Sequence, residues 1–376
     1  MDEKKPENKI STPRLILTML VFVLAAGIIV LAAVNIRHLS WNSMVKTLRS
    51  WFGMEQKAED FYYSSEGALA LESVGGGLLV VTHSGVTLYD EYGDKLTERA
   101  GVYDAPVAVS NGSVAGVYEP GGVTLLTVDS KGADRVYEAD EKLISVSVSR
   151  GGWFVLCTEE ENYKGSVTVL NSQRKAVYKL YSGDGYLLNA ALNDDGTRLA
   201  AIKLTAEGSQ IVEYTLDSDE VKNTVTLGET VALKCIYGAY GDLSVVTDKG
   251  YMIIDSDGVT KSSYDYNGLT LGDFSMGGEA YSAVYCRSYS ETEKSCITTL
   301  DDFGGVIARL DITNPVVDIS ANGERIAVLY ENGLALYDKT MGLQKSFAVG
   351  ADAEGVILLD DARAIVVGEY SAHVFG

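Results

Sequence analysis

Histidine is nearly absent from this chain, which contains only His38, His83 and His373. No two of them have metal-ligand spacing, which argues against a histidine-rich metal site. Neither His83 nor His373 accompanies a Gly-x-Ser-x-Gly nucleophile motif, so we interpret both as hydrogen-bonded strand or turn residues. A Gly-x-x-x-x-Gly-Lys-Ser/Thr phosphate loop is also missing. The sequence therefore predicts no catalytic residue, no metal and no cofactor.

Positive charge is also scarce, with 31 Lys and Arg against 52 Asp and Glu and a formal charge of -21. Residues 1–57 carry eight Lys or Arg and four acids, which leaves -25 for residues 58–376. A domain this acidic repels nucleic acid, so we predict no nucleic-acid partner. Two explanations of the charge stay open, solubility and attraction of a cationic partner.

One long run lacks charge altogether, the 22 residues from Leu15 to Ile36. A helix of that length rises roughly 33 Å and can cross a hydrocarbon core of about 30 Å. We predict a short basic tail over 1–14 and a transmembrane helix over 15–36 that contacts membrane lipid. The alternative is a cleaved signal peptide, but its apolar region normally spans only about 7–15 residues. Leu31-Ala32-Ala33-Val34 also offers no clean cleavage site.

The orientation of this span is only weakly encoded, because four basic residues precede it and three follow it closely. A short N-terminus before a large C-terminal domain is typical of a signal-anchor. We therefore expect a single-pass protein of the cytoplasmic membrane with its domain outside the cell, and the reverse orientation stays open.

Residues 37–60 carry an amphipathic pattern, in which Trp41, Met44, Val45, Leu48 and Phe52 share one helical face. One interpretation is a juxtamembrane helix with Trp41, Trp51 and Phe52 at the membrane interface. The other is a stalk that packs under the following domain.

Proline is rare beyond this point, with 5 in the whole chain against 39 glycines and 23 tyrosines. Short apolar runs alternate with turns such as Asn-Gly, Asp-Gly and Lys-Gly, which is the pattern of β-strands. Second strands begin near residues 78, 114, 153, 199, 243, 281, 325 and 364, at spacings of 36 to 46. Such a period predicts an all-β fold, a β-propeller of eight blades over 61–376, or seven if one degenerate unit is merged.

The eighth unit ends after its third strand at Gly376. A propeller must close its ring or leave an exposed edge. We predict that Phe61-Tyr62-Tyr63-Ser64 supplies the missing outer strand.

At these repeats the chain resembles the broad class of WD40-like, YVTN-like and quinoprotein-like propellers, and in particular membrane-anchored bacterial propellers of unknown function. The resemblance covers residues 61–376 and is architectural. The Gly-His and Trp-Asp signatures of WD40 repeats are missing, and Trp153 is the one tryptophan in the domain. The resemblance implies an interaction platform and carries over no active site.

Two cysteines, Cys286 and Cys296, are symmetric about Glu291 in an expected hairpin. If their strands pair in that register, a disulfide is geometrically feasible, and the alternative is two unpaired thiols. We interpret Cys157 and Cys235 as ordinary buried residues.

Acidic turns at Asn193–Gly196 and Asp255–Gly258 present oxygen ligands, but the second has Tyr266 where a calcium loop needs Glu. We favour Asx-type turns for both. The tyrosines are candidates for stacking on sugars or peptides, although tyrosine is also a good strand former.

Three functions follow from these patterns. The first is a membrane-tethered, non-catalytic propeller that binds a protein or cell-wall partner at its face. The second is an extracytoplasmic hydrolase or lyase acting on glycans at the central channel. The third is a propeller that faces the cytoplasm and recruits soluble partners.

Overall fold

The computed structural model describes residues 61–63, 67–218, 220–290, 293–350, 352–359 and 363–376. The predicted transmembrane helix, the juxtamembrane helix and the interface residues Trp41, Trp51 and Phe52 lie outside these residues. Among the residues described there is no helix long and apolar enough to cross a membrane. Residues 58–376 form one compact unit.

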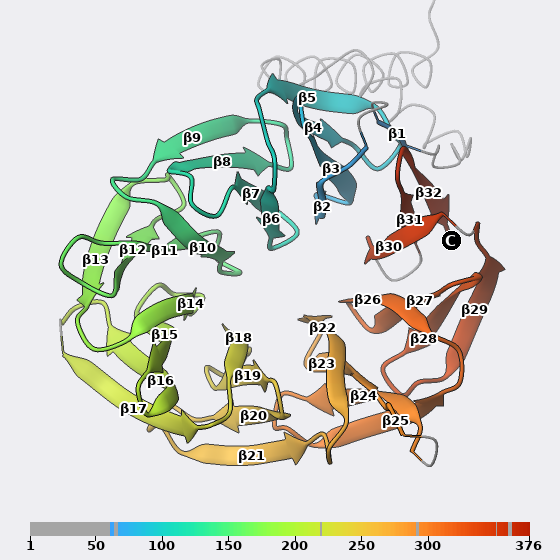
Figure 1. Ribbon diagram of the computed structural model, residues 1–376. Helices are drawn as coiled ribbons and strands as arrows, with labels where there is room; N and C mark the ends of the chain where they lie inside the picture. Colours follow the sequence, from blue (N-terminus) through green and yellow to red (C-terminus); the bar gives the residue numbers. More distant parts are fainter. Residues whose placement is uncertain (1–60, 64–66, 219, 291–292, 351, 360–362) are drawn as a thin grey trace, which may run out of the picture. The chain divides into compact units, whose positions relative to one another are not determined.

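Eight four-stranded antiparallel sheets surround a central opening in Figure 1, which confirms the predicted eight-bladed β-propeller. Blade 1 contains β2 (Ala70–Val74), β3 (Gly77–Thr82), β4 (Gly85–Tyr89) and β5 (Lys95–Ala100). Blade 2 contains β6 (Val107–Ser110), β7 (Val114–Tyr118), β8 (Thr124–Asp129) and β9 (Asp134–Glu138). Blade 3 contains β10 (Leu143–Val148), β11 (Phe154–Thr158), β12 (Gly165–Leu170) and β13 (Ala176–Ser182). Blade 4 contains β14 (Tyr186–Leu192), β15 (Arg198–Thr205), β16 (Gly208–Thr215) and β17 (Val221–Gly228). Blade 5 contains β18 (Ala232–Tyr237), β19 (Leu243–Thr247), β20 (Gly250–Ile254) and β21 (Thr260–Asp265). Blade 6 contains β22 (Thr270–Gly278), β23 (Tyr281–Arg287), β24 (Ser295–Asp301) and β25 (Val306–Ile312). Blade 7 contains β26 (Val316–Asn322), β27 (Arg325–Tyr330), β28 (Gly333–Asp338) and β29 (Leu343–Ala348), and blade 8 contains β30 (Ala353–Leu358), β31 (Ala364–Gly368), β32 (Ser371–Phe375) and β1 (Phe61–Tyr62).

The second strand of each blade is the most apolar, and in β3 the side chains of Leu78 and Leu79 are both fully buried. Successive side chains of a strand point to opposite faces, so Leu79 packs toward blade 2 and Leu78 toward blade 8. Eight apolar clusters of this kind occupy the eight junctions between neighbouring blades. The outer strands are mostly exposed, as in β5, because only one of their faces meets another blade.

The ring is closed by β1, which pairs antiparallel with β32 through Phe61↔Ala372 and Tyr62↔Ser371. The predicted closing strand is thus confirmed. The hydroxyl of the buried Tyr63 lies 2.5 Å from the carbonyl oxygen of Gly368 and 2.8 Å from that of Ser371. Burial raises the pKa of this phenol, which stays protonated and donates at neutral pH.

The turn between the third and fourth strands follows one rule in six blades. An Asp or Asn accepts hydrogen bonds through Oδ1 from the backbone amides two and four residues later, at 2.8–3.1 Å, and these residues are Asp90, Asp129, Asn171, Asp255, Asp301 and Asp338. The residue three positions later has positive φ, and it is glycine in four of the six turns. The Asx turn predicted at Asp255 is therefore confirmed. Asn193 also accepts the amides of Thr197 and Arg198 at 2.9 Å.

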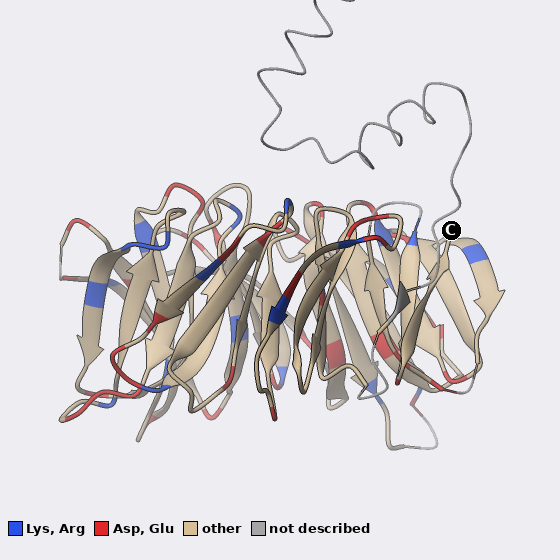
Figure 2. Ribbon diagram, turned by 90° about the horizontal axis from the view of Figure 1, so that it is seen from above, with Lys and Arg blue, Asp and Glu red and all other residues tan. Residues whose placement is uncertain are grey.

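The propeller has two loop faces. We call the face with the loops between second and third strands and between consecutive blades the BC face, and the opposite one the AB face. Because β1 runs antiparallel to β32, the N-terminal end of β1 lies at the AB face, where the C-terminal end of β32 also lies. Acidic residues are spread over the loops of both faces (Figure 2).

Candidate functional site

Side chains on the innermost strands connect three neighbouring blades at the central opening. Asp273 of β22 accepts the amide of Ile319 in blade 7 at 3.0 Å through Oδ2. Asp318 of β26 accepts the amide of Val356 in blade 8 at 2.7 Å. Both aspartates follow a β-bulge, which turns the strand so that its side chain reaches the next blade. Each carboxylate therefore accepts a backbone amide on the innermost strand of the next blade.

The two aspartates also share a hydrogen bond with each other. Burial raises the pKa of Asp273, and burial together with the neighbouring Asp273 raises the pKa of Asp318 to about 7. Two carboxylates this close cannot both ionise without repulsion, so the pair keeps one proton up to about pH 7.

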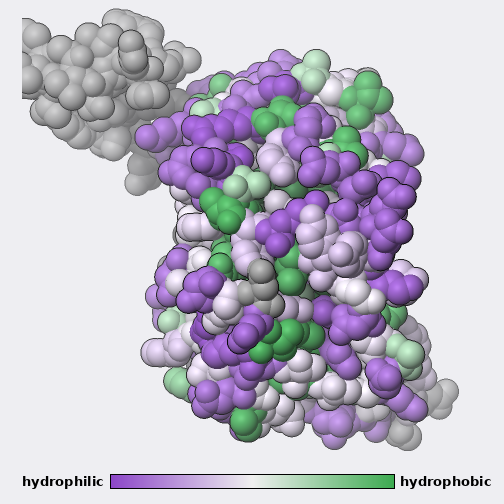
Figure 3. Space-filling view, turned by 90° about the vertical axis from the view of Figure 1, so that its left-hand side faces the viewer, coloured by the Kyte–Doolittle hydropathy of each residue, from purple (hydrophilic) through white to green (hydrophobic). Residues whose placement is uncertain are grey.

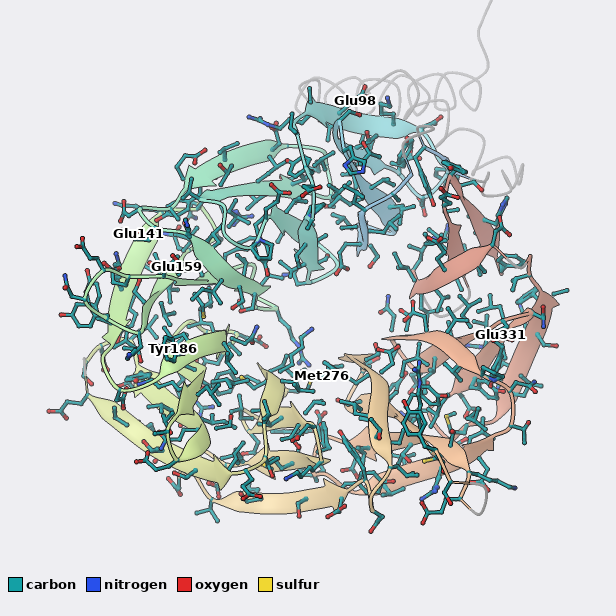
Figure 4. The ribbon with its side chains drawn as sticks, in the orientation of Figure 1. Glu98, Glu141, Glu159, Tyr186, Met276 and Glu331 are labelled. Carbon is teal, nitrogen blue, oxygen red and sulfur yellow. The ribbon has the colours of Figure 1, made fainter. Side chains whose placement is uncertain are left out.

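Glu72 is a third acid on the inner ring, in β2. Burial raises its pKa to about 7, and Lys234 of β18 and the backbone amide of Ser73 oppose this rise. Blades 1 and 5 lie on opposite sides of the ring (Figure 1), so the interaction with Lys234 crosses the central opening. Met276 of blade 6 also lies beside this opening (Figure 4).

A buried polar network joins blades 4 and 5. Glu213 accepts from Arg198 at 3.1 Å, from the hydroxyl of Tyr237 at 2.9 Å and from Asn223 at 2.9 Å. Arg198 also donates to the carbonyl of Gly241 in blade 5. The Glu213 carboxylate accepts hydrogen bonds from Arg198 of blade 4 and from Tyr237 of blade 5, so the network connects the two blades.

The BC face carries a group of exposed tyrosines at the junction of blades 3 and 4. Tyr163, Tyr181 and Tyr186 are 50%, 46% and 58% exposed. The rings of Tyr163 and Tyr181 lie 4.9 Å apart. Lys164 lies 4.8 Å from the ring centre of Tyr186. Leu204, 39% exposed, is directly paired with Tyr186 in the sheet. We call Tyr163, Tyr181, Tyr186 and Leu204 the tyrosine patch.

Acidic loops flank the tyrosine patch, and Figure 4 shows Glu141 and Glu159 on the same side of the ring as Tyr186. The outer rim of this side of the ring is mostly hydrophilic, with small separated hydrophobic areas (Figure 3). The AB face has a smaller aromatic pair, Tyr240 and Phe303, whose rings stack at 5.4 Å.

The sequence predictions for cysteine are confirmed in part. Cys286 and Cys296 are directly opposite each other in β23 and β24, as the predicted register requires. All four cysteines are buried free thiols in the structure, so the disulfide itself stays a prediction. The hydrogen bond between the two thiols lowers the pKa of Cys296 and raises that of Cys286.

The two histidines of the domain lie where the sequence predicts. His83, in a turn of blade 1, bonds the carbonyl oxygen of Tyr103 at 2.8 Å through Nδ1. His373, in β32, lies 3.2 Å from the hydroxyl of Ser371. Within the described residues, no group of three or more His, Cys, Asp or Glu is placed to hold a metal.

The tyrosine patch was not predicted from the sequence. The sequence offers its tyrosines as one group of candidates, and Tyr237, Tyr266, Tyr281 and Tyr285 of that group are buried. The sequence did contain a signal for Tyr163. This aromatic residue follows Glu159-Glu160-Glu161-Asn162 in the acidic loop between β11 and β12, outside any strand.

Comparison with known proteins gives a family and a fold. A family model described as "Family of unknown function (DUF5711)" matches residues 55–371. No curated protein matches the sequence. Among solved structures, the C-terminal WD40 domain of Sif2 matches with a TM-score of 0.62 and 11% identity, over 84% of this chain and 96% of that one.

Two further solved structures match over most of this chain. A structure described as the eukaryotic initiation factor gives a TM-score of 0.53 and 13% identity, over 85% of this chain and 90% of that one. The Cps50 (Swd1) β-propeller domain of Myceliophteria thermophila gives 0.51 and 11%, over 77% and 99%. At these identities the similarity shows the fold alone.

Proposed function

The chain belongs to the family of unknown function DUF5711, and we propose that it is a membrane-tethered, non-catalytic β-propeller that serves as a protein-interaction or ligand-binding scaffold in the bacterial cell envelope. The tether is the uncharged run 15–36. The scaffold is the closed ring of eight blades, which holds its loops on a rigid support.

The observation that carries the scaffold role is the tyrosine patch. Tyrosine is enriched at protein interfaces, and aromatic anchors provide a large share of their binding energy. By contrast, Asp273, Asp318 and Glu213 have identified partners in neighbouring blades, so their burial is explained by the joining of blades.

A second candidate, a glycan hydrolase or lyase at the central opening, is supported by one observation. Glu72 and Asp318 both have a pKa of about 7 and lie on inner strands, and a raised carboxyl pKa suits a general acid. Under this candidate Glu72→Gln abolishes turnover of a glycan, whereas under the scaffold role no turnover exists to lose.

The tether is tested on the full-length chain expressed in bacteria. We expect it to stay in the membrane fraction after washing with high salt and with alkaline carbonate, and a variant lacking residues 15–36 to be released. Release of the full-length chain by these washes contradicts the tether.

The orientation is tested by thiol labelling. Because the native cysteines are buried, the reporter is Ser256→Cys, which stands in an exposed turn. A membrane-impermeant maleimide should label it in intact cells. Labelling only after lysis would instead support a propeller that faces the cytoplasm.

The scaffold role is tested by amine cross-linking in those cells, followed by purification of the full-length chain. We expect one or a few discrete adducts that survive in Glu72→Gln. An absence of adducts together with glycan turnover would reject the scaffold in favour of the enzyme.

A further inference from the structure

The tyrosine patch has the composition of the centre of a protein interface. Three exposed tyrosine rings and Leu204 come from one loop and three strands, the loop before β12, the end of β13 and the paired strands β14 and β15. Aromatic residues are enriched in interface centres and dominate hot spots. Single exposed tyrosines are common on protein surfaces. Here the contacting rings of Tyr163 and Tyr181 accompany a third exposed ring, Tyr186, which makes a local concentration of aromatic side chains.

Neighbouring groups hold the rings of the patch in place. Tyr163 and Tyr181 pack against each other at 4.9 Å, and the ammonium of Lys179 lies 5.1 Å from the centre of the Tyr181 ring. The ammonium of Lys164 lies 3.3 Å from the hydroxyl of Tyr186. Rings that are already ordered lose little conformational entropy when a partner binds.

The surroundings of the patch are acidic. The loops 139–142, 159–164 and 183–185, together with the facing Lys179 and Lys203, contain six acids and four lysines. Lys179 is paired with Glu160 at 3.1 Å and with Asp140 at 3.7 Å, and Lys203 is paired with Asp184 at 3.0 Å. Outside these pairs stand the acids Glu141, Glu159 and Glu161 and the lysines Lys142 and Lys164.

The long-range field has the same sign as these loops. Residues 58–376 carry a formal charge of -25, which attracts cations toward every face of the domain. The tyrosine patch combines this attraction with apolar contact area, so a partner with both basic and apolar side chains matches it in charge and in chemistry.

The patch also lies away from the strand that closes the ring. The N-terminal end of β1 lies at the AB face, whereas the patch lies on the BC face and on blades 3 and 4, across the ring from blade 8. The alternative aromatic pair, Tyr240 and Phe303, lies on the AB face and has two exposed rings where the patch has three.

We propose that the tyrosine patch binds a basic segment of a partner protein, one that presents Lys or Arg around aromatic or aliphatic side chains. The inference rests on the proposed scaffold function and names its surface and the chemistry of its partner. Neutral and anionic glycans are disfavoured, because they offer no cation to the three acids Glu141, Glu159 and Glu161.

The patch is tested with a random peptide phage library panned against the full-length chain in detergent. The patch variant is Y163A/Y181A/Y186A. The control variant is Y240A/Y289A/Y370A, which removes three tyrosines of 72%, 82% and 50% exposure elsewhere on the same ring. Both sets are exposed, so equal melting temperatures are expected, and peptides are compared only between folded proteins.

We expect enriched peptides to be rich in Lys or Arg together with aromatic or aliphatic residues. Synthetic copies should bind the patch variant at least about tenfold more weakly than the wild type, and the control variant within about twofold. Their affinity should also fall when NaCl rises from about 0.05 to 0.5 M, because the charge attraction is screened.

A second variant isolates the charge. Glu159→Lys with Glu161→Lys keeps the rings and should weaken the same peptides by at least about fivefold. The proposal is overturned if no peptide is enriched, if both tyrosine variants lose binding equally, or if the enriched peptides are acidic. Binding of soluble peptidoglycan fragments that is lost only in the patch variant would also overturn it, by assigning the patch to glycan.

These outcomes are separate from those of the scaffold function. If the discrete adducts of the cross-linking experiment persist in the patch variant, the scaffold stands and this surface is wrong. If the wild type gives no adduct, the scaffold itself fails.

Discussion

Asp273 and Asp318 hydrogen-bond to each other across the junction of blades 6 and 7, although both are acids. The pair keeps one proton below about pH 7, and each carboxyl also accepts a backbone amide of the next blade. The closure of the inner ring is therefore linked to pH.

The folded-state pKa of Asp318 is about 7, raised from an ordinary 3.8. The folded protein therefore binds this proton more tightly than the unfolded chain, and the stabilisation is greatest at low pH and is lost as the pH rises toward 7. We predict that the melting temperature falls between about pH 5 and pH 8.

The matched substitution is Asp318→Asn, whose amide can donate to Asp273 as the protonated acid does. It should leave the melting temperature at pH 8 unchanged or raised and should flatten the pH dependence. The control, Asp257→Asn in an exposed turn, should keep the wild-type slope. Equal slopes in Asp318→Asn and the wild type would show that the pair does not hold the proton.

The closing strand gives a second prediction. Deleting residues 58–65 removes β1 and Tyr63 and should leave an open edge on β32, so the whole propeller should melt at lower temperature or aggregate. Tyr63→Phe removes only the hydroxyl that faces Gly368 and Ser371 and should cost about 1–3 kcal/mol. Tyr370→Phe, at an exposed position, is the control and should change little. Unchanged melting after the deletion would contradict closure by β1.

The network around Glu213 gives a third prediction. Glu213→Ala should lower the free energy of unfolding by about 3–5 kcal/mol, because Arg198 and Tyr237 lose their acceptor in a buried place. Glu213→Gln keeps an acceptor and should cost less. Denaturant unfolding measures both, with the exposed Glu220→Ala as the control. A loss below about 1 kcal/mol in Glu213→Ala would show that the network is not a connection between blades.

The thiol pair gives a fourth prediction. Mild oxidation should join Cys286 to Cys296, because they are directly opposite in adjacent strands, and should leave Cys157 and Cys235 free. After unfolding without reductant, maleimide should modify two thiols in the oxidised protein and four in the reduced one. Cys286→Ser should abolish the difference. Four reactive thiols after oxidation would show that the geometry does not allow the bond.

The sequence predicted the start positions of the second strands in the ring well. Second strands predicted near 243, 281 and 364 begin at Leu243, Tyr281 and Ala364, because alternating apolar residues and Gly or Asp turns encode each strand locally. The closing strand was also predictable, since the eighth repeat ends one strand short and Phe61–Tyr62 precede the first.

The sites were much less predictable. Asp273 and Asp318 look like ordinary polar strand residues, and only the bulges and the curvature of the ring bring them together. Tyr163, Tyr181 and Tyr186 belong to a loop and to strands of two blades, so their proximity depends on blade packing that no local pattern records. The membrane anchor, encoded in 15–36, stays a prediction.

The central claim, a scaffold that binds a protein through its BC face, is tested most directly by site-specific photo-cross-linking in living cells. The full-length chain carries benzoylphenylalanine in place of Tyr186 or, as the matched control on the AB face, in place of Tyr240. The account predicts a discrete protein adduct in the membrane fraction from position 186 and none of the same mass from position 240. Equal adducts from both positions, or none from position 186, would contradict it.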